Sequence, residues 1–179
     1  FNYPYFITVW DLAHLTKPYF PEVSKFGKWE SRERFYLNAL KQSAKILVGT
    51  EQGKKEIITF YGISASKVAV CPFPISDLIL DNKFEKIDVR AKYDIKDKYV
   101  LYPAQFWPHK NHYGLLKAFK KVVHNFNSSL ILVLVGTDKG NLNYIKKIIL
   151  KENLEDKIKI LGFIPTDDLY NLYKDAEVL

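Results

Sequence analysis

Short apolar runs alternate with longer amphipathic stretches along the chain. The short runs are rich in Val, Ile, Leu and Tyr, which is typical of strands buried on both faces. The amphipathic stretches carry apolar residues three or four positions apart, which is typical of helices that cover a sheet. Strands are predicted at 7–9, 45–49, 68–70, 99–103, 130–135 and 158–161, and helices at 29–44, 51–60, 113–126, 142–149 and 166–176. This alternation predicts a doubly wound α/β protein.

A polar stretch without a clear period separates two such alternations. We therefore expect two Rossmann-like units, residues 1–76 and residues 97–179, joined by a linker at 77–96. In the first unit, Thr50 is expected to cap the helix that follows it, and Gly62 to end that helix. Ligands bind at the carboxyl ends of the strands in such sheets, so the loops after the strands are the candidate binding sites.

The composition narrows the class of partner only slightly. The chain has 179 residues, a formal net charge of +7, and 27 Lys and Arg residues without a dense basic block. This charge suits an anionic small ligand or an anionic membrane surface, but an ordinary basic surface explains it better than either of these partners does. Nucleic-acid binding is not expected, because the sequence shows no clustered basic face and no familiar motif. The single Cys71 excludes an internal disulfide and fits a reducing compartment.

The two ends of the chain look like interrupted elements. The sequence contains no methionine, begins beside a predicted strand, and ends in Ala176–Leu179, which resembles the start of another strand. We therefore expect an internal segment of a longer protein. The longest purely apolar run, residues 130–135, is far shorter than the roughly 20 residues that a membrane-spanning helix needs.

The segment 103–112, Pro-Ala-Gln-Phe-Trp-Pro-His-Lys-Asn-His, carries the most specific chemical signal. It lies between a predicted strand and a predicted helix, with Lys110 just before the helix. The N-terminus of a helix offers unpaired N–H groups and a positive dipole end, and a lysine adds a full charge. This combination predicts a site for a phosphate or diphosphate. A solvated lysine at a helix start is the alternative.

Four groups of residues resemble family 4 glycosyltransferases, which have the GT-B fold. They are 8–15 with 18–22, 44–51 with Lys54, 102–112, and 161–165 with 168–170 and 172–176, in the order of that family. The resemblance covers nearly the whole chain, and its third group is the most specific. It implies two Rossmann-like GT-B units, both incomplete here: the end of an N-terminal acceptor-side domain and the first part of a C-terminal donor domain.

The resemblance also implies an activity. Enzymes of this family transfer a sugar, here of the hexosyltransferase type, from a nucleotide-sugar donor to a glycan or lipid-linked acceptor. The implied reaction retains the anomeric configuration and uses neither a metal nor a cofactor. The family's pair of donor-site glutamates would follow Leu179, so we expect these 179 residues to be inactive alone. A non-catalytic α/β module that binds a phosphorylated ligand or a polysaccharide is the alternative.

On the donor side, Lys110 matches the family's phosphate-binding lysine. Gln105 stands where the family usually has an arginine. Either the donor phosphate is therefore bound with less positive charge, or another residue supplies that charge. Asn111 either contacts the donor or caps the turn. Gly136 either lets backbone approach a ligand or forms a plain tight turn.

The base of the nucleotide is expected at Phe163 and Ile164, which match the loop that holds it in the family. Backbone there would contact the edge of the base, and the apolar side chains would pack on its face. The alternative is that these side chains join the hydrophobic core at the end of a strand.

In the first unit, Trp10 replaces a histidine that many family members have just before Asp11, and that histidine normally lies near the donor sugar and the reaction centre. We expect His14 to line the site and to hydrogen-bond the sugar or the acceptor, although a locally satisfied loop histidine explains it as well. Asp11 is the second candidate, and it has the alternative role of orienting its loop through the backbone.

The first unit is also rich in aromatic residues near lysines. These residues are Phe1, Tyr3, Tyr5, Phe6, Tyr19, Phe20 and Phe26, with Lys17, Lys25 and Lys28. They suit peripheral membrane contact, an acceptor groove or ordinary core packing. With the family resemblance, they lead us to expect a cytoplasmic protein of polysaccharide or cell-envelope biosynthesis, at the inner face of the plasma membrane.

Overall fold

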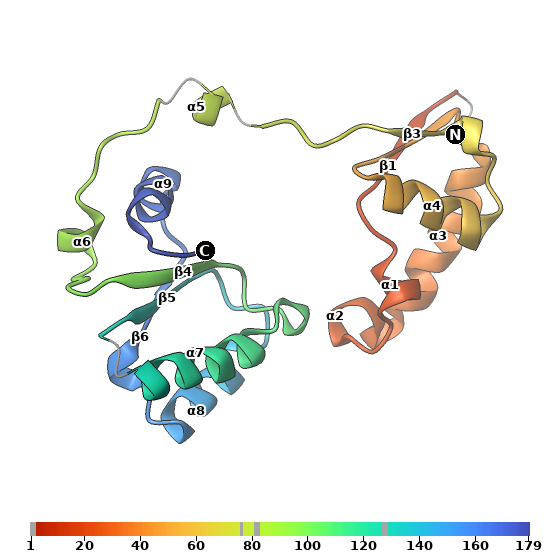
Figure 1. The fold of residues 1–179 in the computed structure, drawn as a ribbon. Helices are drawn as coiled ribbons and strands as arrows, with labels where there is room; N and C mark the ends of the chain where they lie inside the picture. Colours follow the sequence, from red (N-terminus) through yellow and green to blue (C-terminus); the bar gives the residue numbers. More distant parts are fainter. Residues whose placement is uncertain (1–2, 76, 81–82, 127–128) are drawn as a thin grey trace. The chain divides into compact units, whose positions relative to one another are not determined.

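The computed structural model describes residues 3–75, 77–80, 83–126 and 129–179 (Figure 1). The chain divides into two compact units, residues 1–76 and 77–179, which are described separately. In the described residues, each unit contains a parallel sheet of three strands. Strands alternate with helices in both units, as the sequence predicted.

The first unit is built on strands β1 (Phe6–Val9), β2 (Lys45–Val48) and β3 (Val68–Val70), paired in that order. Val9 lies opposite Val48, and Val48 lies opposite Val70, so the carboxyl ends of the three strands share one edge. The helical segments are α1 (Ala13–Thr16), α2 (Pro21–Ser24), η1 (Lys25–Gly27), α3 (Lys28–Gln42), α4 (Glu51–Tyr61) and η2 (Ala65–Lys67).

Local chemistry explains the ends of α4. The Thr50 hydroxyl oxygen accepts a hydrogen bond from the Gly53 N–H at 3.0 Å, which satisfies one of the free donors of the first turn. Gly62 follows the helix in the left-handed conformation, with φ of 62°, where glycine avoids the steric cost of a Cβ. Both predicted helix boundaries are confirmed.

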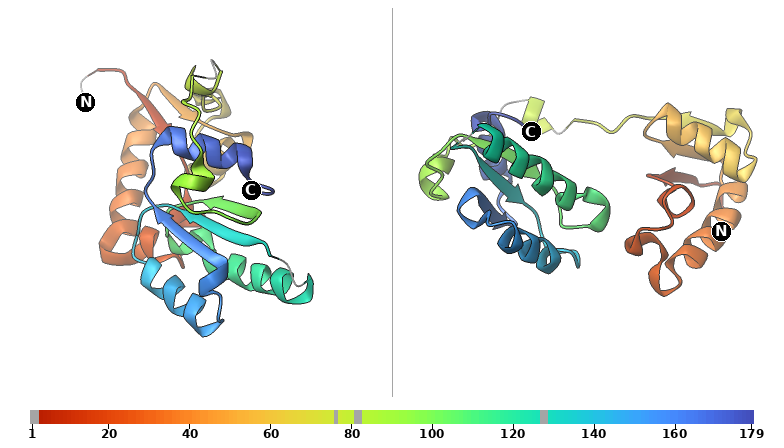
Figure 2. Two further views of the ribbon diagram at one scale, coloured as in Figure 1. Left: turned by 90° about the vertical axis from the view of Figure 1, so that its left-hand side faces the viewer. Right: turned by 60° about the horizontal axis from the view of Figure 1, so that its bottom comes forward.

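The second unit is built on β4 (Tyr99–Pro103), β5 (Ile131–Val135) and β6 (Ile158–Gly162), paired in that order. Its helical segments are α5 (Asp77–Leu80), α6 (Val89–Lys92), η3 (Pro108–Lys110), α7 (His112–Phe126), α8 (Leu142–Lys151), η4 (Glu155–Lys157) and α9 (Thr166–Asp175). Helix α9 lies on one face of the sheet, and α7 and α8 lie on the other (Figure 1 and Figure 2).

The central strand β5 is buried along its whole length because helices cover both faces of the sheet. Its residues alternate between two clusters of apolar side chains. Ile131, Val133 and Val135 join the cluster that contains Leu172 of α9. Leu132 and Leu134 join the cluster that contains Leu116 and Phe119 of α7 and Ile145 and Ile149 of α8.

The predicted linker at 77–96 is too long, because its second half packs into the core of the second unit. Val89 and Ile95 are buried in the same cluster as the first strand of the sheet. Asp88 caps α6 by accepting a hydrogen bond from the Ala91 N–H at 3.0 Å. A helix of one turn is too short to show a hydrophobic period, so the sequence pattern did not reveal it.

A buried carboxylate fastens this segment to α9. The fully buried Asp168 accepts a hydrogen bond from the Tyr93 hydroxyl and pairs with the Lys92 ammonium at 2.6 Å. Burial by itself would raise the pKa of Asp168, but the hydrogen bonds from Lys92 and Tyr93 outweigh it and lower that pKa. Residues 88–96 therefore belong to the second unit through both apolar and ionic contacts.

Candidate functional site

In the second unit, the turn after β4 presents Lys110 at the carboxyl edge of the sheet. Lys110 ends η3 and precedes the first residue of α7 by two positions. Its backbone is fixed, because its N–H donates to the Trp107 carbonyl at 3.1 Å and its carbonyl accepts from the Tyr102 hydroxyl at 2.7 Å. The side chain is exposed to solvent. A fixed backbone with an exposed ammonium is suited to binding an anion that arrives from solution.

Asn111 acts as a cap of α7, the second of the two roles expected for it. The residue is left-handed, with φ of 51°, and its Oδ1 accepts a hydrogen bond from the Gly114 N–H at 3.1 Å. Its own carbonyl accepts from the Leu115 N–H at 3.2 Å. His112 is buried and stacks on Phe106, with 4.4 Å between ring centroids. Both residues therefore hold the turn that carries Lys110.

Gln105 is linked to an aromatic side chain and a second lysine. The Trp107 indole N–H donates to Gln105 Oε1 at 2.9 Å. The Lys139 ammonium lies 5.7 Å from the centroid of the Trp107 ring, within the range of a cation–π contact. Lys139 was not identified from the sequence, because only the pairing of two loops brings it beside Trp107. Its position shortly after the central strand was the available signal.

Gly136 permits this pairing of loops. A Cβ at Gly136 would lie 2.3 Å from the Ala104 carbonyl oxygen, and the residue has φ of 153°, which favours glycine. The next residues confirm the close approach, because the Phe106 N–H donates to the Thr137 carbonyl at 3.0 Å. Gly136 therefore allows the backbone of the β4 loop to lie close to it, whereas the approach of a ligand expected from the sequence stays a prediction.

The loop that carries Lys139 is held by Asp138. Its Oδ1 accepts hydrogen bonds from the N–H groups of Gly140 at 2.7 Å and of Leu142, the first residue of α8, at 3.1 Å. These backbone hydrogen bonds lower the pKa of Asp138. The carboxylate thus forms its hydrogen bonds within its own loop, and these bonds stabilise the backbone on both sides of Lys139.

Phe163 and Ile164 have different environments. Phe163 is 82% exposed, so its ring is open to a ligand, whereas Ile164 is buried in the cluster around β5. The prediction that the Ile164 side chain packs on a base is therefore wrong, because that side chain fills the core. Gly162, with φ of 71°, turns the chain at the end of β6 and separates the two orientations.

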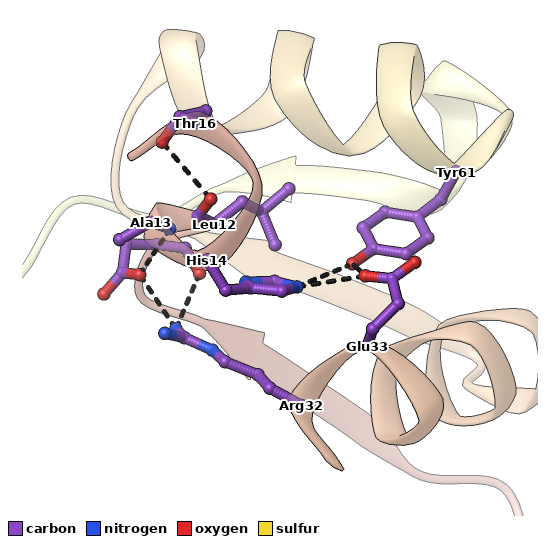
Figure 3. A network of polar contacts seen from close by, with 8 residues as sticks. Leu12, Ala13, His14, Thr16, Arg32, Glu33 and Tyr61 are labelled. Atoms are coloured by element: carbon purple, nitrogen blue, oxygen red, sulfur yellow. Dashed lines mark hydrogen bonds and ion pairs between the residues drawn. The ribbon is translucent and has the colours of Figure 1, made fainter. Parts of the chain in front are cut away.

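In the first unit, His14 is enclosed among helices (Figure 3). Its side chain is fully buried, and its Nε2 lies 3.0 Å from Glu33 Oε2. The Tyr61 hydroxyl donates to the same carboxylate oxygen at 2.8 Å. The prediction that His14 lines a binding site is wrong, because α1 turns the ring inward to Glu33 of α3 and Tyr61 of α4. The alternative, a loop histidine satisfied locally, is right only in giving His14 a structural contact, because its partners Glu33 and Tyr61 lie on other helices and not in its own loop.

The surroundings of His14 favour its neutral form. Burial lowers the pKa of His14, and the hydrogen bond to Glu33 acts in the opposite direction without overcoming it. The Glu33 carboxylate only accepts hydrogen bonds, so the neutral ring carries its proton on Nε2. In the part of the chain that the structure describes, no group hydrogen-bonds to Nδ1.

We predict that stability of the first unit falls as the pH drops below the ordinary histidine pKa of about 6.5. The folded state has the lower pKa, so the unfolded state binds more protons and is favoured in acid. Urea unfolding of the intact protein between pH 7.5 and 5 measures this loss. The free energy of unfolding of the variant His14→Gln should depend less on pH than that of the parent protein. The other buried histidine, His112, is present in both proteins and so contributes equally to both pH dependences. Identical pH dependence in the two proteins would refute the prediction.

Asp11 orients its loop, which is one of the two roles expected for it. Its Oδ1 accepts hydrogen bonds from the Ala13 N–H and from the Arg32 guanidinium, each at 2.8 Å. Arg32 also donates to the Asp11 carbonyl at 2.9 Å. Asp11 remains half exposed and lines a cavity of about 130 Å³ at the carboxyl ends of β1 and β2.

A larger hollow of about 560 Å³ is lined by residues of α2, η1 and α3 and by none of the strands. Ligands of parallel sheets bind at the carboxyl ends of strands, so the smaller cavity is the better candidate. Within the described residues, no group of three or more His, Cys, Asp or Glu side chains could hold a metal ion. No helix among those residues combines the length and apolar character needed to cross a bilayer.

The fold and these loops define an α/β protein of Rossmann-like type that presents lysines at the edge where such sheets bind ligands. Residues 83–179, more than half of the chain, match the family Glycosyl transferases group 1. The chain therefore belongs to this family, and the resemblance noted in the sequence is confirmed. The match includes every donor-side residue discussed above.

Curated relatives agree with this assignment. The chain is 25% identical over 158 residues to "O-antigen chain mannosyltransferase B" of Escherichia coli, covering 87% of this chain and 42% of the relative. It is 24% identical over 143 residues to "Uncharacterized glycosyltransferase MJ1607" of Methanocaldococcus jannaschii, covering 77% of this chain and 36% of the relative. The chain therefore spans less than half the length of these relatives.

Solved structures show the same fold. The glycosyltransferase WaaG, described as involved in lipopolysaccharide biosynthesis, matches 96% of this chain and 48% of its own chain, with a TM-score of 0.73 and 17% identity. Anabaena Alr3699/HepE in complex with UDP-glucose matches 97% of this chain and 45% of its own, with a TM-score of 0.71 and 18% identity. The predicted fold class, Rossmann-like units of the GT-B type that are incomplete here, is confirmed.

Proposed function

We propose that the chain is part of an enzyme that transfers a sugar from a nucleotide-sugar donor to a glycan or lipid-linked acceptor. The family match over the second unit, which presents Lys110 beside the start of α7, carries this proposal. The mannosyltransferase relative and the structure of HepE with UDP-glucose support a nucleotide-sugar donor. Retention of the anomeric configuration is part of the proposal and follows from the family resemblance.

The chemistry requires positive charge where the donor leaves its diphosphate. As the bond between the sugar and the phosphate breaks, negative charge grows on the leaving group, and fixed cationic donors lower the barrier. We assign this role to Lys110, with Lys139 as a second cation across Trp107. Lys139 would supply part of the positive charge that the family's arginine, replaced here by Gln105, normally provides. The nucleotide sugar is a substrate and not a cofactor, and a reaction without a metal is part of the proposal that follows from the family resemblance.

The proposed setting is polysaccharide or cell-envelope synthesis in the cytoplasm, at the inner face of the plasma membrane. The relatives named for O-antigen and lipopolysaccharide synthesis support the pathway class. Exposed aromatic side chains at Tyr19 and Phe26, next to Lys17, Lys25 and Lys28, support peripheral membrane contact.

A transfer assay with the intact protein tests the proposed function. The protein is incubated with UDP-, GDP-, CDP- and dTDP-sugars and a mixture of oligosaccharide and lipid-linked acceptors. Release of a nucleoside diphosphate together with an extended glycan is the expected result. Binding of nucleotide sugars or glycans without any transfer would instead support the non-catalytic module. The isolated 179 residues should show no transfer.

A further inference from the structure

Two large aromatic side chains stack on each other at the surface of the first unit. Trp10 directly follows β1, and Phe73 follows β3, at the carboxyl edge of the sheet. Their ring centroids are 4.5 Å apart, and the ring planes differ by 14°. Trp10 is 71% exposed and Phe73 is 51% exposed. Such rings carry much apolar surface, so an exposed stacked pair at a ligand-binding edge indicates a contact surface.

Polar side chains surround the cavity that this pair borders. The cavity of about 130 Å³ is lined by both rings and by Asp11, Gln52 and Glu56. Gln52 Nε2 donates to Glu56 Oε1 at 3.0 Å, so an amide and a carboxylate stand side by side on α4. A flat apolar surface beside carboxylates and an amide matches a sugar ring, which has apolar C–H faces and a rim of hydroxyl groups.

Gly49 makes the aromatic pair possible. A Cβ at this position would lie 2.7 Å from Phe73 Cε2 and 2.9 Å from Phe73 Cζ. Only the far end of the Phe73 side chain is in the way, so an alanine would push the ring aside and leave the backbone in place. Glycine at the end of β2 thus allows Phe73 to lie over the strand end and to meet Trp10.

We propose that the outer face of Trp10, with Phe73 stacked behind it, is the platform for one pyranose ring of the acceptor glycan, and that Asp11, Gln52 and Glu56 contact the hydroxyl groups of that ring. The small cavity fits a single ring better than an extended ligand, since sites for larger ligands are typically at least about 300 Å³. We assign the ring to the acceptor because Lys110 and Lys139, which we propose bind the diphosphate of the donor, belong to the other unit. This inference rests on the proposed function.

Glycan binding by the intact protein tests the platform. The probe is an array of oligosaccharides of hexoses and N-acetylhexosamines without nucleotides, and dissociation constants are then measured for those bound. Trp10→Ala and Phe73→Ala should weaken binding at least about tenfold. Gly49→Ala should also weaken it, with an unchanged circular dichroism spectrum. The matched control is Phe60→Ala on α4, whose ring is 47% exposed and does not line the cavity.

Three results would overturn the platform. They are no glycan binding by the parent protein at millimolar concentration, full binding by Trp10→Ala, or equal loss in the Phe60→Ala control. UDP and GDP affinities are measured in parallel to separate this inference from the proposed function. If Trp10→Ala weakens nucleotide-sugar binding and spares glycans, the ring belongs to the donor and the inference fails. If the parent protein binds glycans but no nucleotide, the proposed function fails instead.

Discussion

Replacing Gly136 by alanine is expected to destabilise the second unit by about 3 kcal/mol or more. The added Cβ would lie 2.3 Å from the Ala104 carbonyl oxygen and 2.8 Å from the Gln105 Cα. These are backbone atoms, which cannot turn aside as the end of a side chain can. Urea unfolding of the intact protein, followed by circular dichroism, measures the change in free energy of unfolding.

Gly140→Ala is the matched control for this prediction. Gly140 also has a positive φ, 92°, but no atom lies within 4 Å of a Cβ built there. Its substitution should cost about 1 to 2 kcal/mol from backbone strain alone. Equal destabilisation by the two substitutions would show that the contact between Gly136 and the β4 loop is not important for stability.

Replacing Lys110 by alanine is expected to lower kcat/KM for the donor about 10- to 150-fold. A charge-assisted hydrogen bond to a phosphate contributes roughly 1.5 to 3 kcal/mol, and each 1.4 kcal/mol is a factor of ten. Because charge on the diphosphate grows as the reaction proceeds, kcat should fall as well as the apparent affinity for the donor. Steady-state kinetics with the donor varied at a saturating acceptor concentration measure both effects.

Lys121→Ala is the control for the loss of one positive charge. Lys121 lies on the exposed side of α7, further from the start of that helix. This variant should retain the kinetics of the parent protein. Unchanged donor kinetics in Lys110→Ala, or an equal loss in the control, would count against Lys110 as the phosphate-binding residue.

The sequence predicted features that depend on neighbouring residues. Apolar runs identified the six strands found among the described residues to within one or two residues at each end. Thr50 and Gly62 marked the ends of α4, because capping depends on a few adjacent groups. The same applies to Lys110, which follows a strand and precedes a helix in both the prediction and the structure.

Features that depend on contacts between distant residues were missed. His14 was expected at a binding site, but Glu33 and Tyr61, which come much later in the chain, enclose it. The role of Gly136 is set by the loop around Ala104, and Lys139 gains its place beside Trp107 through the same pairing of loops. No local pattern encodes these contacts, so only the folded arrangement reveals them.

Nucleotide binding measured by titration calorimetry tests the central claim, that Lys110 contacts the diphosphate of a nucleotide-sugar donor. The nucleoside diphosphate and the unphosphorylated nucleoside of the preferred base are each titrated into the intact parent protein and into Lys110→Ala. We predict that the variant binds the diphosphate about tenfold or more weakly than the parent protein does, and the nucleoside equally well. Equal affinity of both proteins for the diphosphate would contradict it.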